Sequence, residues 1–155
     1  MQDIVLVAAA RTAVGKFGGS IANIPATELG AIVIREAIAR AKLDPAQVGE
    51  VIMGQVLAAG AGQNPARQAS MKSGVPKETP ALTINRLCGS SIESIILAAR
   101  IVADGETDMA AAGGAESMSN APHVLKSARW GNKMGDMVMI DAMLASLQDP
   151  FGAGH

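Results

Sequence analysis

The hydrophobic residues of this chain fall into short continuous runs separated by stretches of helical spacing. Four apolar runs predict strands, at residues 4–10, 51–57, 82–84 and 109–112. The run at 4–10 has no polar alternation, which is typical of a strand covered on both faces. Three stretches with apolar residues at three- and four-residue steps predict helices, over residues 25–42, 65–73 and 92–103. This alternation of strands and helices predicts an α/β fold with a mostly parallel or mixed sheet.

The stretch 92–103 has the clearest helical pattern. Ile92, Ile95 and Ile96 begin one apolar stripe, and Glu93 and Arg100 lie on the other face. A helix that is apolar on one stripe buries that stripe. We therefore expect this helix to pack against the sheet through its isoleucines.

Weaker signals lie elsewhere in the chain. Asp44 followed by Pro45 predicts a capped helical turn over residues 46–48. The glycine-rich loop 15–19 contains Lys16, but its spacing is not that of a phosphate-binding P-loop, so a turn is favoured. An apolar stripe predicts a further helix over residues 136–147, after which the sequence stops within a loop. We expect further polypeptide beyond it.

Composition and charge limit the classes of function. The chain has 155 residues, 49% hydrophobic and 17% charged, which is enough for one folded domain. A net charge of −1 gives no case for binding nucleic acid or an anionic membrane, and no apolar run reaches the length of a membrane span. A single cysteine cannot form an internal disulfide, which fits the cytoplasm. With two histidines far apart, no metal site is expected.

Cys88 is the candidate catalytic residue. It follows the predicted strand 82–84 and precedes the predicted helix 92–103. Free backbone N–H groups and the positive end of a helix dipole favour the thiolate, which is the nucleophilic form, and those N–H groups can stabilise an oxyanion. A lone cysteine is more often a small buried residue. Its polar neighbours, including Asn85 and Ser90, favour the nucleophile.

A general base for this thiol is harder to find. Nucleophilic catalysis by cysteine needs a base within hydrogen-bond reach. His123 and His155 are the only histidines, and both lie outside the predicted strand–helix core. Another role is more usual for each of them.

Four segments of the chain resemble the thiolases, the family of acetyl-CoA acetyltransferases. They are the opening loop at 11–19, Gly-Gln-Asn-Pro-Ala-Arg-Gln-Ala at 62–69, Asn-Arg-Leu-Cys-Gly-Ser at 85–90 and Gly-Gly-Ala-Glu-Ser-Met-Ser-Asn-Ala-Pro at 113–122. They follow one another in the order of the family and span most of the chain. Two positions depart from the family pattern: Ser91 stands where glycine is usual, and Ala115 where methionine is usual.

The resemblance implies a thiolase-like layered fold. Residues 1–116 would form the N-terminal α/β core, and residues 117–155 the truncated beginning of the loop domain, with a tetramer-forming segment at 121–134. Cys88 would accept the acyl group as a thioester, with its own backbone N–H in an oxyanion hole. Leu147 and His155 would contact the pantetheine arm of coenzyme A.

The resemblance also implies substrates and partners. The substrates would be acetyl-CoA or acetoacetyl-CoA, with coenzyme A as a substrate and no permanently bound cofactor, and the complete enzyme would be a homotetramer. In thiolases a C-terminal half carries the catalytic histidine, a second cysteine and an asparagine, and this sequence has no such half. His155 does not match that histidine.

Three functions remain open from the sequence. The chain is one half of an acetyl-CoA C-acetyltransferase whose other half is a separate or lost polypeptide, or it is a non-catalytic fragment that needs a C-terminal half. The third is a related condensing enzyme, such as a ketoacyl synthase. The motifs at 62–68 and 116–119 argue against this third function.

Overall fold

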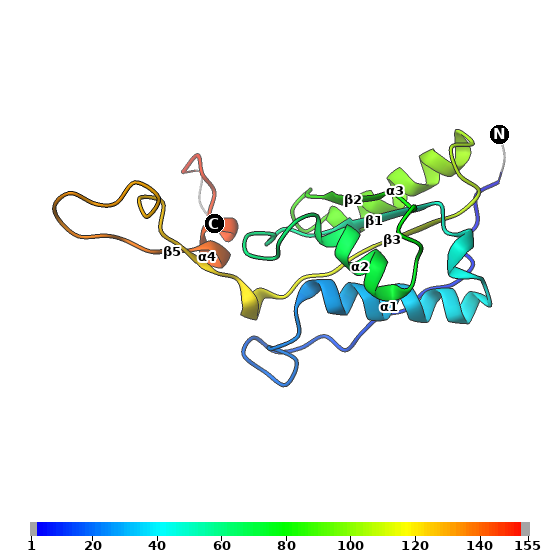
Figure 1. The fold of residues 1–155 in the computed structure, drawn as a ribbon, viewed down its shortest axis with the longest axis horizontal. Helices are drawn as coiled ribbons and strands as arrows, with labels where there is room; N and C mark the ends of the chain where they lie inside the picture. Colours follow the sequence, from blue (N-terminus) through cyan, green and yellow to red (C-terminus); the bar gives the residue numbers. More distant parts are fainter. Residues whose placement is uncertain (1–2, 153–155) are drawn as a thin grey trace.

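Three parallel strands form the central sheet of the protein (Figure 1). The computed structural model describes residues 3–152. The strands are β1 (Glu50–Gly54), β2 (Ala81–Ile84) and β3 (Ala110–Gly114), in the order β2-β1-β3. Val51 lies opposite both Ala81 and Ala111, which fixes the register on both sides of β1. The predicted α/β fold with a parallel sheet is confirmed.

Helices cover both faces of this sheet. They are α1 (Ala26–Ala41) and α2 (Pro65–Ser73) on one face and α3 (Ser90–Ala103) on the other. Under α1 and α2 lies the core, in which Val51 and Met53 of β1 pack with Ile34, Ile38 and Ala69. Val51 and Met53 alternate with residues that face α3, as expected for a strand buried on both faces.

The ends of the helices agree with the sequence signals. Asn64 accepts a hydrogen bond from the N–H of Arg67 at 3.2 Å and caps α2, and Gly74 ends the same helix at a φ of 97°. The predicted turn after Asp44 is a 3₁₀ helix, η1 (Pro45–Gln47). Asp44 accepts from the N–H of Ala46, while Gln47 accepts from the N–H of Asp44, both at 2.9 Å.

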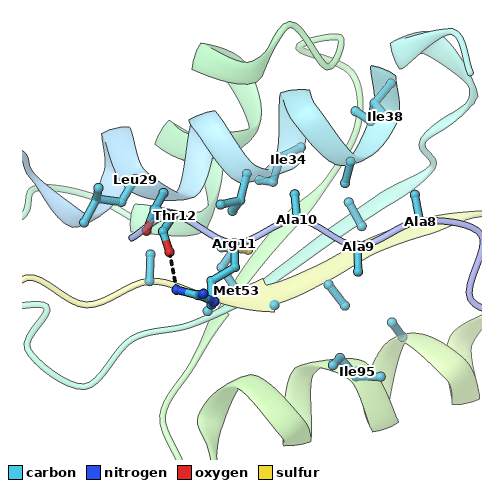
Figure 2. A pocket seen from close by; sticks show the side chains of 18 of the residues that line it. Ala8, Ala9, Ala10, Arg11, Thr12, Leu29, Ile34, Ile38, Met53 and Ile95 are labelled. Carbon is cyan, nitrogen blue, oxygen red and sulfur yellow. Dashed lines mark hydrogen bonds between the residues drawn. The ribbon is translucent and has the colours of Figure 1, made fainter. Parts of the chain in front are cut away.

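The expected packing of α3 is wrong for two of its three isoleucines. Ile92 and Ile96 face outward, 66% and 40% exposed, whereas Ile95 lines a cavity of about 900 Å³ beside β3 (Figure 2). The residues that pack on the sheet are small: Ser90, Ser94 and Ala98 are buried. Because small residues let a helix approach a sheet closely, they occupy the positions of α3 that face the sheet. The outward isoleucines form a second apolar surface on this helix.

Residues 4–10 form no strand, contrary to the sequence prediction. Their backbone is extended, but within residues 3–152 no other strand pairs with it. Val5 and Leu6 are 72% and 85% exposed, although the apolar run predicted burial. A strand is defined by hydrogen bonds to a neighbouring strand, and this segment lies apart from the edge of the sheet.

The helix predicted over residues 136–147 forms only in its last part. Asp141 accepts from the N–H groups of Met143 and Leu144 at 2.8 and 3.3 Å, so α4 (Ala142–Leu147) begins after it. Ile140 instead pairs with Val124, in an antiparallel ribbon of β4 (His123–Val124) and β5 (Ile140–Asp141). The apolar residues that predicted one helix over residues 136–147 therefore belong partly to β5 and partly to α4.

Residues 118–152 extend away from the sheet (Figure 1). They begin with a 3₁₀ helix, η2 (Met118–Asn120), and continue through the β4–β5 ribbon to α4. A domain boundary at residue 116 stays a prediction. None of the helices within residues 3–152 has both the length and the apolar character needed to cross a membrane.

Candidate active site

The three parallel strands end at one edge of the sheet, where ligands bind in many open α/β folds. The hydrogen-bond ladder of the sheet continues one residue beyond β1 and one residue beyond β3. Gln55 donates its N–H to the carbonyl of Ile84 at 3.0 Å, and Ala115 donates to the carbonyl of Gly54 at 3.1 Å. The loops that follow β1, β2 and β3 are therefore held side by side at this edge.

Cys88 lies in the turn between β2 and α3 and is exposed to solvent. Leu87 has a φ of 51°, in the left-handed region that residues other than glycine rarely adopt. Asn85 accepts a hydrogen bond from the N–H of Leu87 at 3.0 Å, and Gly89 donates to the carbonyl of Arg86 at 3.1 Å. These bonds hold a tight turn that presents the thiol to solvent. Strained backbone of this kind is concentrated at functional sites.

The side chain of Ser90 holds this turn by hydrogen bonds to two of its residues. Its buried hydroxyl accepts from the N–H of Arg86 at 2.8 Å and donates to the carbonyl of Leu87 at 2.6 Å. A Cβ placed on Gly54 would lie 2.6 Å from the backbone of Ser90, so only glycine at the end of β1 lets α3 start here. The position of Cys88 thus depends on a glycine more than thirty residues earlier in the chain.

The first turn of α3 has unused hydrogen-bond donors. Among residues 3–152, no oxygen accepts from the backbone N–H groups of Cys88, Ser91 or Ile92, whereas Glu93 donates to the carbonyl of Gly89 at 2.9 Å. Free N–H groups at a helix start attract negative charge, and the helix dipole adds to this. The arrangement around Cys88 is therefore suited to stabilising a thiolate or an oxyanion.

Arg86 is the cation nearest to Cys88 in sequence, and it is paired. Its guanidinium forms an ion pair with the carboxylate of Glu93 in α3. The side chain of Arg86 is largely exposed, whereas that of Glu93 is mostly covered. This pair connects the turn to the first turns of the helix and leaves little net charge beside the thiol.

Glu116 has a role that the sequence did not reveal. Its two carboxylate oxygens accept from the N–H groups of Val56 and Leu57 at 2.7 and 3.2 Å. The carboxylate therefore joins the loop after β3 to the loop after β1. Its place two residues after the paired glycines at the end of β3 was the only available signal.

The polar residues after Glu116 hold the N-terminal loops. Ser119 accepts from the N–H of Gly18 at 3.0 Å, and Asn120 donates to the carbonyl of Ala22 at 2.6 Å. Ser117 donates to the carbonyl of Ile24 at 3.1 Å. A cavity of about 220 Å³ lies between Ser117, Asn120 and the loop after β1, and Cys88 does not line it.

The structure does not bring the other predicted site residues to Cys88. Leu147 is the last residue of α4 and is 57% exposed, and His155 lies outside the described residues. His123 lies opposite Asp141 in the β4–β5 ribbon, and no hydrogen bond within residues 3–152 joins it to Cys88. In the same part of the chain, no group of three or more histidines, cysteines or carboxylates is placed to hold a metal ion.

Comparisons with known proteins find relatives along the whole length of the chain. Residues 4–155 match the family model described as thiolase, N-terminal domain. Over the whole chain, the sequence is 55% identical to acetyl-CoA acetyltransferase of Cupriavidus necator and 51% identical to that of Pseudomonas aeruginosa. It is 47% identical to a probable acetyl-CoA acyltransferase of Staphylococcus epidermidis. The chain spans about 40% of the length of these relatives.

Proposed function

Because this chain belongs to the thiolase family, we propose that it acts in acyl transfer between coenzyme A thioesters, with Cys88 as the acyl-accepting nucleophile. The observation that carries the proposal is the geometry of the turn before α3. There an exposed thiol lies beside backbone N–H groups that have no acceptor within residues 3–152. The names of the relatives point to acetyl-CoA as the acyl donor.

The proposed first step is a transthioesterification. The thiolate of Cys88 attacks the carbonyl carbon of acetyl-CoA, and the carbon–sulfur bond to coenzyme A breaks in the tetrahedral intermediate that follows. The acetyl group remains on Cys88 as a thioester, and the coenzyme A thiolate leaves and takes up a proton. The charge on the intermediate oxygen is stabilised by backbone N–H donors, of which that of Cys88 is one.

The proposed second step releases the acetyl group. In the condensing direction, the enolate of a second acetyl-CoA attacks the carbonyl of the Cys88 thioester, the bond between that carbon and the sulfur of Cys88 breaks, and acetoacetyl-CoA and the Cys88 thiolate are released. Thiolysis is the reverse: the Cys88 thiolate attacks the 3-keto carbonyl of acetoacetyl-CoA, acetyl-CoA leaves as its enolate and takes up a proton, and coenzyme A then removes the acetyl group from Cys88. Both directions need a base to remove a proton from carbon or sulfur, and His123 lies in the β4–β5 ribbon with no bond to Cys88.

A second polypeptide half therefore belongs to the proposal. The chain corresponds to about 40% of the length of its relatives, and we infer that the remaining length supplies the acid and base groups. In the complete enzyme, a homotetramer on this proposal, Leu147 and His155 contact the pantetheine arm of coenzyme A. The competing function is a non-catalytic thiolase fragment, which is favoured for the chain alone because no base within residues 3–152 is hydrogen-bonded to the thiol of Cys88.

Mass spectrometry of Cys88 tests the proposal. The chain is incubated with acetyl-CoA, alone and together with the C-terminal part of the Cupriavidus necator relative that this chain does not match. We expect an acetyl adduct on the peptide that contains Cys88 when both polypeptides are present, because the second half completes the base and the binding site. A Cys88→Ser variant serves as the control, since it keeps the size of the side chain and removes the thiol.

The two candidate functions give different results in this experiment. An adduct that requires the second polypeptide, together with formation of acetoacetyl-CoA, supports the split enzyme. An adduct without any turnover in the mixture supports the non-catalytic fragment. If no adduct forms on Cys88 under either condition, its assignment as the nucleophile is wrong.

A further inference from the structure

Glu116 joins two loops at the sheet edge where Cys88 lies. It comes two residues after the end of β3, and its carboxylate accepts from the N–H groups of Val56 and Leu57 in the loop after β1. One residue earlier, Ala115 donates its N–H to the carbonyl of Gly54 at 3.1 Å. Three hydrogen bonds therefore connect the segment after β3 to residues 54–57.

The carboxylate of Glu116 binds backbone N–H groups and takes part in no ion pair within residues 3–152. A partly buried carboxylate costs free energy unless donors satisfy it, and an ionised oxygen binds an N–H group more strongly than a neutral one does. Its two donors come from consecutive residues of one irregular loop. The charge of Glu116 is therefore offset by the loop that it holds.

The strand ends that these bonds connect lie against the first turn of α3. Gly54 ends β1, and a Cβ on it would lie 2.6 Å from the backbone of Ser90. Gly114 ends β3, and a Cβ on it would lie 2.1 Å from the hydroxyl oxygen of Ser91. Glycine has no side chain to pack and a permissive backbone, so such ends need other bonds to stay together. The bonds of Ala115 and the loop bonds after it supply them.

The same residues contact both ends of the turn that carries Cys88. Before the turn, Gln55 donates its N–H to the carbonyl of Ile84 at 3.0 Å. After it, Ser90 lies against Gly54 and holds the turn through its hydroxyl. A shift of the loop after β1 would therefore reach the turn from both sides.

We propose that Glu116 is a positioning residue for Cys88. By binding the loop after β1 to the end of β3, it holds the first turn of α3 in place and keeps the thiol beside the free N–H groups there. Within residues 3–152 no hydrogen bond joins Glu116 to Cys88, so it acts through the backbone. The inference rests on the proposed function because it concerns the same nucleophile, but the reactivity of the thiol is measurable without acetyl-CoA.

Alkylation of Cys88 by iodoacetamide tests this role. The chain has a single cysteine, so the rate of alkylation, followed by mass spectrometry, reports on this thiol alone. We expect Glu116→Ala to slow alkylation at neutral pH by about threefold to tenfold, because N–H groups that have moved stabilise the thiolate less well. A wild-type rate in a folded Glu116→Ala variant would overturn the proposal.

Glu116→Gln separates the hydrogen bonds from the size of the side chain. Glutamine has nearly the same shape, but an amide nitrogen that cannot accept from an N–H group replaces one carboxylate oxygen. We expect its alkylation rate to lie between those of the wild-type chain and of Glu116→Ala. A wild-type rate for Glu116→Gln shows that size alone is enough and overturns the proposal. This variant decides the question if Glu116→Ala does not fold.

Asp44→Ala is the matched control for a general loss of stability. The carboxylate of Asp44 also accepts from a backbone N–H, that of Ala46, but it precedes β1 and so lies at the other end of this strand. We expect this variant to lower the free energy of unfolding in urea and to keep the wild-type alkylation rate. Equal slowing in the Asp44 and Glu116 variants would assign the effect to lost stability and overturn the proposal.

Hydrogen exchange locates the change in the backbone. The N–H groups of Arg86, Gly89 and Ser90 are bonded within the turn. We expect all three to exchange faster in Glu116→Ala than in the wild-type chain, because the turn opens more often. Slower alkylation with unchanged exchange at these groups would show that Glu116 does not act through the turn and would overturn the proposal.

The acetyl adduct separates this inference from the proposed function. The adduct on Cys88 is measured for the wild-type chain and for Glu116→Ala, each with the second polypeptide. Formation at equal rates overturns the positioning role and leaves the acyl transfer standing. If the wild-type chain forms no adduct but Glu116→Ala slows alkylation, the positioning role stands and the acyl transfer is overturned.

Discussion

At the scale of single residues, the site is defined by backbone geometry rather than by charge. Leu87 adopts a left-handed conformation, and the hydroxyl of Ser90 bonds to both sides of the turn. Together they expose Cys88 at the start of α3. Arg86, the cation nearest to Cys88 in sequence, is paired with Glu93. The reactivity proposed for Cys88 therefore depends on N–H groups that stay free only while this turn is intact.

A residue-scale prediction concerns Glu50, the first residue of β1. Burial raises the pKa of its carboxyl group, repulsion from Glu106 raises this pKa further, and a hydrogen bond from the backbone of Val51 partly lowers it. The folded state therefore binds a proton more tightly than the unfolded state, so stability falls as pH rises through the raised folded pKa. We expect Glu50→Gln to increase the free energy of unfolding at neutral pH.

Urea unfolding of the wild-type chain and of the Glu50→Gln variant at several pH values measures this change in the free energy of unfolding. The gain from Glu50→Gln should shrink as pH falls towards the unfolded pKa of a glutamate, about 4.3. Glu106→Gln is the matched control. It removes only the repulsion, the smaller of the two raising effects, so it should give a smaller gain of the same sign. A constant gain at all pH values would contradict the assignment.

At the scale of elements, α3 is held close to the sheet by small residues. Ser94 donates its hydroxyl to the carbonyl of Gly113 at 2.7 Å, which bonds the helix directly to β3. A Cβ on Gly114 would lie 2.1 Å from the hydroxyl oxygen of Ser91 and 3.0 Å from the carbonyl oxygen of Gly54. Ser91, where glycine is usual in the family, is thus accommodated by a glycine on the strand beneath it.

This packing predicts coupling between Ser91 and Gly114. We expect Gly114→Ala to lower the free energy of unfolding by roughly 1–3 kcal/mol, because the added methyl group overlaps Ser91. Adding Ser91→Gly should recover part of the loss, and a double-mutant cycle in urea measures the interaction. Gly54→Ala is the comparison variant, since its clash is with the backbone of Ser90 and Ser91→Gly should not relieve it. Additive effects for Gly114→Ala and Ser91→Gly would show that the two residues do not meet.

At the scale of the whole molecule, apolar side chains are exposed on several parts of residues 3–152. Two of these surfaces lie beside the sheet: the isoleucine face of α3, made by Ile92 and Ile96, and the N-terminal segment beside the cavity of about 900 Å³. The sheet between them buries a core on the α1 and α2 side. Large exposed apolar patches mark interaction sites or lead to aggregation. Both surfaces are therefore candidates for contact with another polypeptide.

The isoleucine face predicts association of the isolated chain. We expect sedimentation to show self-association, and replacement of Ile92 and Ile96 by glutamine to reduce it without lowering the free energy of unfolding, because these side chains do not pack on the sheet. Ile34→Ala is the control, since this residue is buried in the core and its truncation should cost roughly 2–5 kcal/mol. A monomeric wild-type chain would contradict the expectation.

The amino-acid sequence by itself determined most elements of this protein and the place of its candidate nucleophile. Caps such as Asn64 and Asp44, the apolar runs of β1 and β3, and the junction at Cys88 are local signals, because they depend on neighbours a few residues away. Tertiary structure alone decided three features: the outward isoleucines of α3, the bonds of Glu116 and the unpaired state of residues 4–10. Each depends on contacts between residues far apart in the chain, which periodicity cannot encode.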